Sequence, residues 1–177
     1  MSKLLAMPPW IQRLDASDRA IFARLCLSPG SGSAARTFWS CITHLGGARA
    51  SIGLTVLALL FPAVDLRLCW RTLLLLGWSH LVVQIVKRTV GRPRPSTAPT
   101  FTSLVEVPDR FSFPSGHSCA AMAVAIGFAT AFPPCAVPLL VVAGLVGFSR
   151  VMLGVHYPGD VVVGQVIALM TAYPILR

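Results

Sequence analysis

Residues 118–149, SCAAMAVAIGFATAFPPCAVPLLVVAGLVGFS, contain no Asp, Glu, Lys or Arg. As one helix this run would be about 48 Å long, whereas the hydrocarbon core of a bilayer is ~30 Å thick. The prolines at positions 133 and 134 interrupt a helix interior, so the run divides into two apolar helices joined by a tight turn. This stretch predicts a helical hairpin inside a membrane.

The composition of the whole chain also indicates membrane insertion. Of its 177 residues, 55% are hydrophobic and 12% are charged, and the mean hydropathy is +0.73; soluble domains carry roughly 25% charged residues. The formal net charge of +9 favours anionic partners such as lipid headgroups and phosphates. Because the basic residues separate apolar segments and form no polar face, nucleic acid is not an expected partner.

Three further apolar segments complete the expected bundle. Residues 50–64 and 72–86 are uncharged runs with charged residues at both ends, and residues 161–176 form the last run. The first two are slightly shorter than the ~20 residues that a bilayer requires, but flanking Arg and Lys side chains can snorkel to the interface. Together with the hairpin, these segments predict about five spanning helices.

The N-terminal part of the chain has a different pattern. Residues 14–28 and 35–45 place apolar side chains on one side and polar ones on the other, which is typical of helices that lie in the membrane interface. A length of 177 residues suits one domain. The sequence therefore predicts an all-α, polytopic membrane domain over residues 1–177, with interfacial amphipathic segments in 1–49 and a spanning core in 50–177.

The polar residues of the core gather on one side of the membrane when the crossings are counted. The long polar loop 88–114 joins the second and third spans on one side, the hairpin crosses and returns, and the last span starts on that same side. The residues expected on this face are Lys87, Arg94, Ser115, His117, Arg150, His156 and Asp160.

Cations and a helix start on one face predict an anion site. The third span offers backbone N–H groups from residues 115–117 to a phosphate oxygen, and Gly116 lets the backbone approach closely. Arg94 and Arg150 can each donate to two phosphate oxygens, and Lys87 adds a third positive charge.

Two histidines on the same face add chemistry that binding alone does not require. One imidazole can attack phosphorus while the other protonates the leaving oxygen. Asp160 lies one helical turn after His156 and can hold the second ring nitrogen, if the helix begins near residues 157–158.

Each of these features also has an ordinary structural explanation. Pro-Ser-Gly-His at 114–117 is a common helix start, and His156 with Asp160 could be a capped helix end. The joint order and common side of the motifs favour a site. His44 and His80 lie outside this pattern, and His80 is expected to form a hydrogen bond within the bundle.

The ordered motifs resemble the three-part signature of the type 2 phosphatidic acid phosphatases, whose superfamily includes bacterial acid phosphatases and vanadium haloperoxidases. The matching residues are Lys87 with Arg94-Pro95, then Pro114-Ser115-Gly116-His117, then Ser149-Arg150 with His156 and Asp160.

The resemblance implies a role for each residue. His156 would form a phosphohistidine intermediate, Asp160 would orient it, and His117 would be the general acid. The phosphate would be held by Lys87, Arg94, Ser115, Gly116 and Arg150. The family's phosphatases require no metal or other cofactor, and the implied partner is a phosphorylated lipid in the bilayer.

The resemblance leaves the substrate open. Phosphatidic acid or phosphatidylglycerophosphate is the favoured class, with undecaprenyl diphosphate or lipid A phosphates as the alternatives. The non-enzymatic alternative is a membrane protein that binds anionic lipid, against which the His156–Asp160 pair argues. Basic residues flank the spans on both sides, so their count does not decide orientation. Similarity to bacterial members implies a plasma (inner) membrane protein whose site faces the periplasm or exterior.

Overall fold

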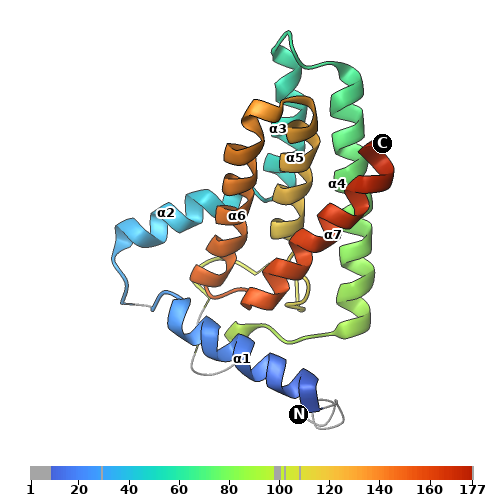
Figure 1. Ribbon diagram of the computed structural model, residues 1–177. Coiled ribbons are helices and arrows are strands. Elements are labelled where there is room, and N and C mark those ends of the chain that lie inside the picture. Colours follow the sequence, from blue (N-terminus) through green and yellow to red (C-terminus); the bar gives the residue numbers. More distant parts are fainter. Residues whose placement is uncertain (1–8, 29, 98–100, 102, 108, 177) are drawn as a thin grey trace.

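The computed structural model describes residues 9–28, 30–97, 101, 103–107 and 109–176, and the regular elements within these ranges are all helices. Seven α-helices follow one another along the chain (Figure 1). They are α1 (Pro9–Leu25), α2 (Ser33–His44), α3 (Ala48–Leu57), α4 (Leu66–Val90), α5 (Gly116–Ala131), α6 (Ala136–Met152) and α7 (Pro158–Leu176). Short 3-10 helices occur at η2 (Ala58–Leu60), η3 (Pro95–Thr97) and η4 (Pro133–Cys135).

Three of the described helical segments are long and apolar enough to cross a membrane: Leu66–Val90, Pro133–Met152 and Pro158–Leu176. Ser33–His44 and Ala48–Leu60 are bent by 61° and together make a fourth candidate. The expected spans all occur as helices, but α5 has 16 residues, which is short for a span. Length and composition therefore support three or four crossings, where the sequence analysis expects about five.

Helix α5 can be short because other helices surround it. It packs against α3, α4, α6 and α7, and its buried face is built largely from alanine, glycine and serine. A Cβ atom on Gly127 would lie 2.5 Å from Oγ1 of Thr72 on α4, and one on Gly164 of α7 would lie 2.5 Å from the carbonyl oxygen of Ser115. Small residues let membrane helices approach closely, and here they fix the start of α5 against α7.

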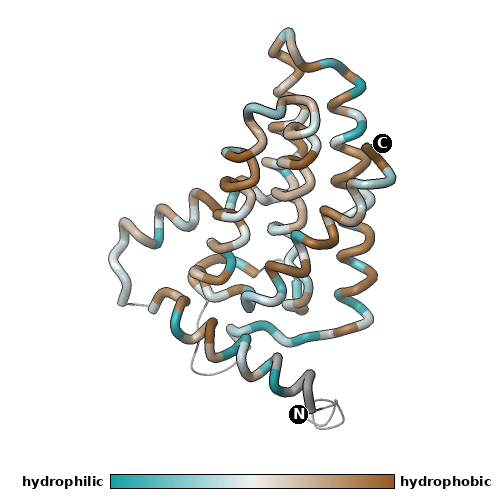
Figure 2. Tube along the Cα trace, viewed as in Figure 1, coloured by the Kyte–Doolittle hydropathy of each residue, from teal (hydrophilic) through white to brown (hydrophobic). Residues whose placement is uncertain are grey.

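The outer face of the bundle is apolar. Side chains such as Trp78, Val137 and Met170 are exposed on α4, α6 and α7. In Figure 2, hydrophobic residues follow these helices, whereas hydrophilic residues gather along α1 and the connection after α4. An apolar surface of this kind requires lipid around it, so the chain is a multi-pass membrane protein.

Helix α1 lies across one end of the bundle, next to the start of α7 (Figure 1). Its Phe22 is fully buried and packs edge-on against Tyr157, with ring centroids 5.3 Å apart. Its Asp18 carboxylate accepts a hydrogen bond from the backbone N–H of Gly159, at 2.7 Å. The first amphipathic segment is therefore docked on the core at the end where α4 and α6 finish.

Candidate active site

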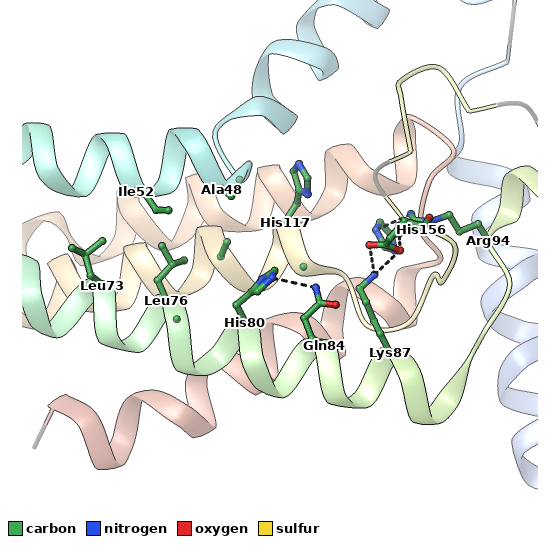
Figure 3. A pocket seen from close by; sticks show the side chains of 15 residues that line it. Ala48, Ile52, Leu73, Leu76, His80, Gln84, Lys87, Arg94, His117 and His156 are labelled. Carbon is green, nitrogen blue, oxygen red and sulfur yellow. Dashed lines mark hydrogen bonds and ion pairs between the residues drawn. The ribbon is translucent and has the colours of Figure 1, made fainter.

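The three sequence motifs meet at one end of the bundle. Lys87 lies in the last turn of α4, which Gly91 terminates with a left-handed φ of 62°. Arg150 lies in the last turn of α6, and Asp160 lies in the first turn of α7. Five of the expected site residues line one cavity of about 520 Å³, seen from close by in Figure 3. These are Lys87, Arg94, Gly116, His117 and His156.

Arg94 holds the backbone and the ring of the third motif. Its Nη1 donates to the carbonyl oxygen of Val155 at 2.8 Å and lies 3.2 Å from Nε2 of His156. A guanidinium group can only donate, so Nε2 is the acceptor and carries the available electron pair. The proton of the neutral ring is then on Nδ1, the atom that faces Asp160.

Asp160 is anchored independently of the histidine. Its carboxylate accepts hydrogen bonds from the backbone N–H of Tyr157 at 2.8 Å, from the Ser112 hydroxyl and from Nη1 of Arg92 at 2.6 Å. Nδ1 of His156 lies 3.5 Å from Oδ2 of Asp160, beyond normal hydrogen-bond length, and has no hydrogen bond to the described residues. Burial lowers the pKa of His156 to about 3, although Asp160 acts in the opposite direction.

Arg150 is a buried cation with unused donors. Its Nη1 donates to Oγ1 of Thr43 at 2.8 Å, but neither Nε nor Nη2 has a hydrogen-bond partner in the part of the chain that the structure describes. Its carbonyl oxygen accepts from the amides of Val155 and His156, which ties it to the third motif. Buried donors of a charged group are costly when unpaired, so this geometry is typical of a site for an anion.

A carboxylate lies between the two remaining cations. Nζ of Lys87 is 3.1 Å from Oδ2 of Asp109, and Nη2 of Arg94 donates to Oδ1 of Asp109 at 2.8 Å. Burial of Asp109 opposes its ionisation, but the hydrogen bond from Arg94 and the charge of Lys87 hold its pKa below the usual range. Asp109 therefore binds the same donors that a phosphate oxygen would use.

The start of α5 differs in one respect from the expectation. Ser115 caps the helix, with its hydroxyl oxygen accepting from the amide of Ser118 at 3.4 Å. The backbone N–H of Ser115 is not available to a ligand, because it donates to the carbonyl oxygen of Asp160 at 2.9 Å. The amides of Gly116 and His117 make no hydrogen bond to the described residues, so two N–H groups remain for an anion, where three were expected.

His117 stands apart from the His156 group. It lines the same cavity, and in Figure 3 its ring points toward the connection between α2 and α3. A Cβ atom on Gly47, in that connection, would lie 3.8 Å from its Nε2. Within the described ranges no hydrogen bond fixes the ring, which leaves both its nitrogens open to the cavity or to solvent. The rings of His117 and His156 thus lie apart in the lining of the same cavity.

Arg92 is a site residue that the sequence analysis misses. Its guanidinium lies 2.6 Å from Asp15, 2.8 Å from Asp18 and 2.6 Å from Asp160, and it stacks on the Tyr157 ring with its Cζ 4.1 Å from the centroid. Burial opposes its charge, but these carboxylates raise its pKa. In the sequence, the only indication of its role is the segment Arg-Pro-Arg-Pro at 92–95, in which Arg92 lies two residues before the expected phosphate-binding Arg94.

Asp109, Ser112 and Thr43 are missed for a similar reason. Each is a common surface residue type in sequence, and each reaches the site through the folding of a loop or through helix packing. Thr43 contacts Arg150 across 107 positions and Ser112 contacts Asp160 across 48 positions. No local spacing rule links such pairs.

Comparisons with known proteins agree with this arrangement. Residues 68–177 match the family model of the PAP2 superfamily. A decaprenylphosphoryl-5-phosphoribose phosphatase of Mycobacterium tuberculosis is 36% identical over 151 residues, covering 82% of this chain and 78% of that protein. A phosphatidylglycerophosphatase B of Bacillus subtilis is 35% identical over 153 residues, covering 73% and 68%.

A solved structure has the same fold. The crystal structure of a transmembrane PAP2 type phosphatidylglycerolphosphate phosphatase from Bacillus subtilis covers 93% of this chain and 85% of that chain, with a TM-score of 0.76 and 28% identity. The helical membrane bundle and the named relatives agree with the motifs in the sequence. The chain therefore belongs to the PAP2 superfamily and is a membrane lipid phosphatase.

Proposed function

We propose that this phosphatase hydrolyses a phosphoester of a membrane lipid through a phosphohistidine intermediate on His156, without a metal ion or other cofactor. The observation that carries the proposal is the buried Arg150, whose Nε and Nη2 lack partners among the described residues, in a motif with a deprotonated His156 Nε2. An anion held by Arg150, Lys87 and Arg94 would place phosphorus within reach of that nitrogen.

In the first step, Nε2 of His156 attacks phosphorus, and the P–N bond forms while the bond to the lipid oxygen breaks. His117 gives its proton to that oxygen, so the lipid leaves as an alcohol. The Nδ1 proton of His156 remains on the ring, and the Asp160 carboxylate stabilises the resulting positive charge. The N–H groups of Gly116 and His117 and the three cations stabilise the charge that builds on the phosphoryl oxygens.

In the second step, a water molecule attacks phosphorus from the side that the lipid has left. His117, now deprotonated, takes one proton from that water, the P–N bond breaks, and inorganic phosphate is released. His117 is thereby returned to its protonated form for the next cycle. Its position on the opposite side of the cavity from His156 supports both roles, because attack and departure at phosphorus are in line.

Among substrates, the phosphatidic acid or phosphatidylglycerophosphate class is our first candidate, because a relative and a solved neighbour carry the name of the second. The relative named for decaprenylphosphoryl-5-phosphoribose widens the class to phosphorylated headgroups on other lipids. Undecaprenyl diphosphate and lipid A phosphates are the alternative substrates. In every case the phosphate is carried by a lipid that reaches the site from the bilayer.

The experiment is phosphate release by the purified protein in detergent across a panel of these lipid phosphates, with and without EDTA. We expect turnover that survives the chelator and is absent in His156→Ala. Turnover lost with EDTA and restored by magnesium would contradict the proposed mechanism. Absence of release from every lipid phosphate in the panel would contradict the proposed function itself.

We further propose a bacterial plasma membrane location with the site facing outward, supported by the bacterial sources of the relatives. Cys135 in η4 follows α5 at the end away from the site and is exposed. In a Cys26→Ser/Cys41→Ser background, an impermeant thiol reagent should label Cys135 only after the cells are permeabilised. Labelling of intact cells would place the site on the cytoplasmic side.

A further inference from the structure

The cavity at the active site continues along α4 into the apolar part of the bundle. Lys87 and Arg94 lie at one end, and Leu73, Leu76 and Ile52 line the other (Figure 3). Such a gradient suits a molecule with a phosphate at one end and a hydrocarbon chain at the other. Between the two ends, the wall of the cavity is polar, because it includes His80 and Gln84.

These two residues lie on the same face of α4 as Lys87. Spacings of three and four residues separate Leu76, His80, Gln84 and Lys87, so their side chains follow one line along the helix. With a rise of 1.5 Å per residue, Gln84 lies about 4.5 Å and His80 about 10 Å from Lys87 along the axis. Leu73 lies about 21 Å from Lys87 along the same helix axis. A group bound by the pair would therefore lie between the phosphate and the chain.

His80 and Gln84 keep polar atoms that can still form hydrogen bonds with a ligand. Nε2 of Gln84 lies 3.1 Å from Nε2 of His80, and an amide nitrogen only donates, so the ring nitrogen accepts. Oε1 of Gln84 forms no hydrogen bond with the residues that the structure describes. Polar side chains inside membrane helices are costly in lipid, and they face the bundle interior or a cavity where they mark the path of a substrate.

We propose that His80 and Gln84 form a headgroup subsite that binds a hydroxyl group lying between the substrate's phosphate and its hydrocarbon chain. The substrate class is then a lipid whose phosphate is attached to a glycerol or sugar that keeps a free hydroxyl, and this inference rests on the proposed function. A hydroxyl can donate to Oε1 of Gln84 and also accept from the second amide N–H, whereas a second phosphate can only accept and would leave Oε1 facing a negative charge. The cations that line the cavity, Lys87 and Arg94, are both at the phosphate end.

The test uses two lipid phosphates that differ by one hydroxyl. One is octadecyl glycerol phosphate, and the other is its analogue without the middle hydroxyl; farnesyl diphosphate is the third probe. For the purified wild-type protein, kcat/KM should be about 3- to 10-fold higher on the hydroxylated lipid, the effect of one neutral hydrogen bond. Gln84→Met, which keeps the length of the side chain, and His80→Phe should each bring the ratio of the two kcat/KM values close to one.

Gln165→Met is the matched control, because it removes the same amide from α7 at a residue outside the cavity lining. This variant should keep the wild-type ratio. A wild-type protein that releases phosphate but shows no preference for the hydroxyl would overturn the subsite and leave the proposed function standing. The subsite is also wrong if either α4 variant loses farnesyl diphosphate turnover while keeping the hydroxyl preference. If the wild type turned over none of the three probes, the proposed function would fail together with the subsite.

Discussion

At the scale of single residues, two side chains bear on the reaction that we propose: Asp109 on the binding of the substrate phosphate, and His117 on the departure of the lipid alcohol. Asp109 forms ion pairs with both Lys87 and Arg94, whereas His117 is held by no hydrogen bond to the described residues. A substrate phosphate must compete with the first for its cations. In the proposed mechanism, His117 then gives the proton with which the lipid alcohol leaves.

Removing the charge of Asp109 should strengthen anion binding. In Asp109→Asn, Lys87 and Arg94 lose an anionic partner, so an incoming anion no longer has to displace a carboxylate from them. Vanadate, which resembles phosphorus under attack, should inhibit this variant at about tenfold lower concentration than it inhibits the wild type. Glu106→Gln, a carboxylate change in the same loop, should leave the inhibition constant unchanged. Weaker inhibition of Asp109→Asn would show that Asp109 helps to bind the anion.

The role of His117 should depend on the leaving group. His117→Ala should lose roughly 10²–10⁴-fold in kcat on a lipid phosphomonoester, whose alkoxide needs a proton in order to leave. The loss on nitrophenyl phosphate should be much smaller, because nitrophenolate leaves without protonation. Gln165→Met, at a residue of α7 outside the cavity lining, is the control and should match the wild type. Equal losses of His117→Ala on both substrates would exclude His117 as the acid.

At the scale of elements, α1 is linked to the catalytic end of α7 through a single arginine. Arg92, in the connection after α4, binds Asp15 and Asp18 of α1 on one side and Asp160 of α7 on the other. Asp18 also accepts from the backbone of Gly159. The same guanidinium thus docks an amphipathic helix and orients the carboxylate that faces His156.

Comparison of Arg92→Gln with a variant of α1 should separate these two functions of the network. We expect kcat to fall about 10–100-fold with little change in KM, as for other residues that position a catalytic partner. The double variant Asp15→Asn/Asp18→Asn keeps Arg92 on Asp160, so it should expose α1 to limited proteolysis while kcat falls less. An equal loss of kcat in both variants would mean that the docking of α1, and not the orientation of Asp160, is what matters.

At the scale of the whole molecule, the sequence predicts what local spacing controls. The double proline at 133–134 predicts the turn between α5 and α6, and the four-residue interval from His156 to Asp160 predicts their proximity. Counting crossings also predicts that the motifs share one end of the bundle. Length and composition alone give three or four crossings instead of about five, because α5 has only 16 residues; its burial among neighbouring helices relaxes the length that lipid would otherwise impose.

The contacts that sequence reasoning misses depend on tertiary packing. Arg92 meets Asp15 across 77 positions, and Asp109 enters the site through the path of a long loop. The amide of Ser115 is used by Asp160 because Gly164 lets α7 approach the start of α5. Such details follow from how elements pack and not from the spacing of residues within them.

Acid should destabilise the fold through His156. Its pKa is about 3 in the folded protein and about 6.5 when exposed, so the unfolded chain binds an extra proton between these values. This contribution to stability is complete above pH ~6.5 and falls by up to ~1.4 kcal/mol per pH unit as the pH drops toward 3. Thermal unfolding in detergent between pH 7.5 and 4.5 measures it. His156→Asn should show a flatter dependence, and an identical slope would contradict the buried, neutral imidazole.

The central claim is that phosphate passes through His156. A radiolabelled lipid phosphate mixed rapidly with the purified protein and quenched in alkaline detergent should leave label on the protein, stable in alkali and lost in acid. Mass spectrometry should place it on His156, and His156→Ala should carry none. Label on any other residue, or phosphate release by His156→Ala at the wild-type rate, would contradict the account.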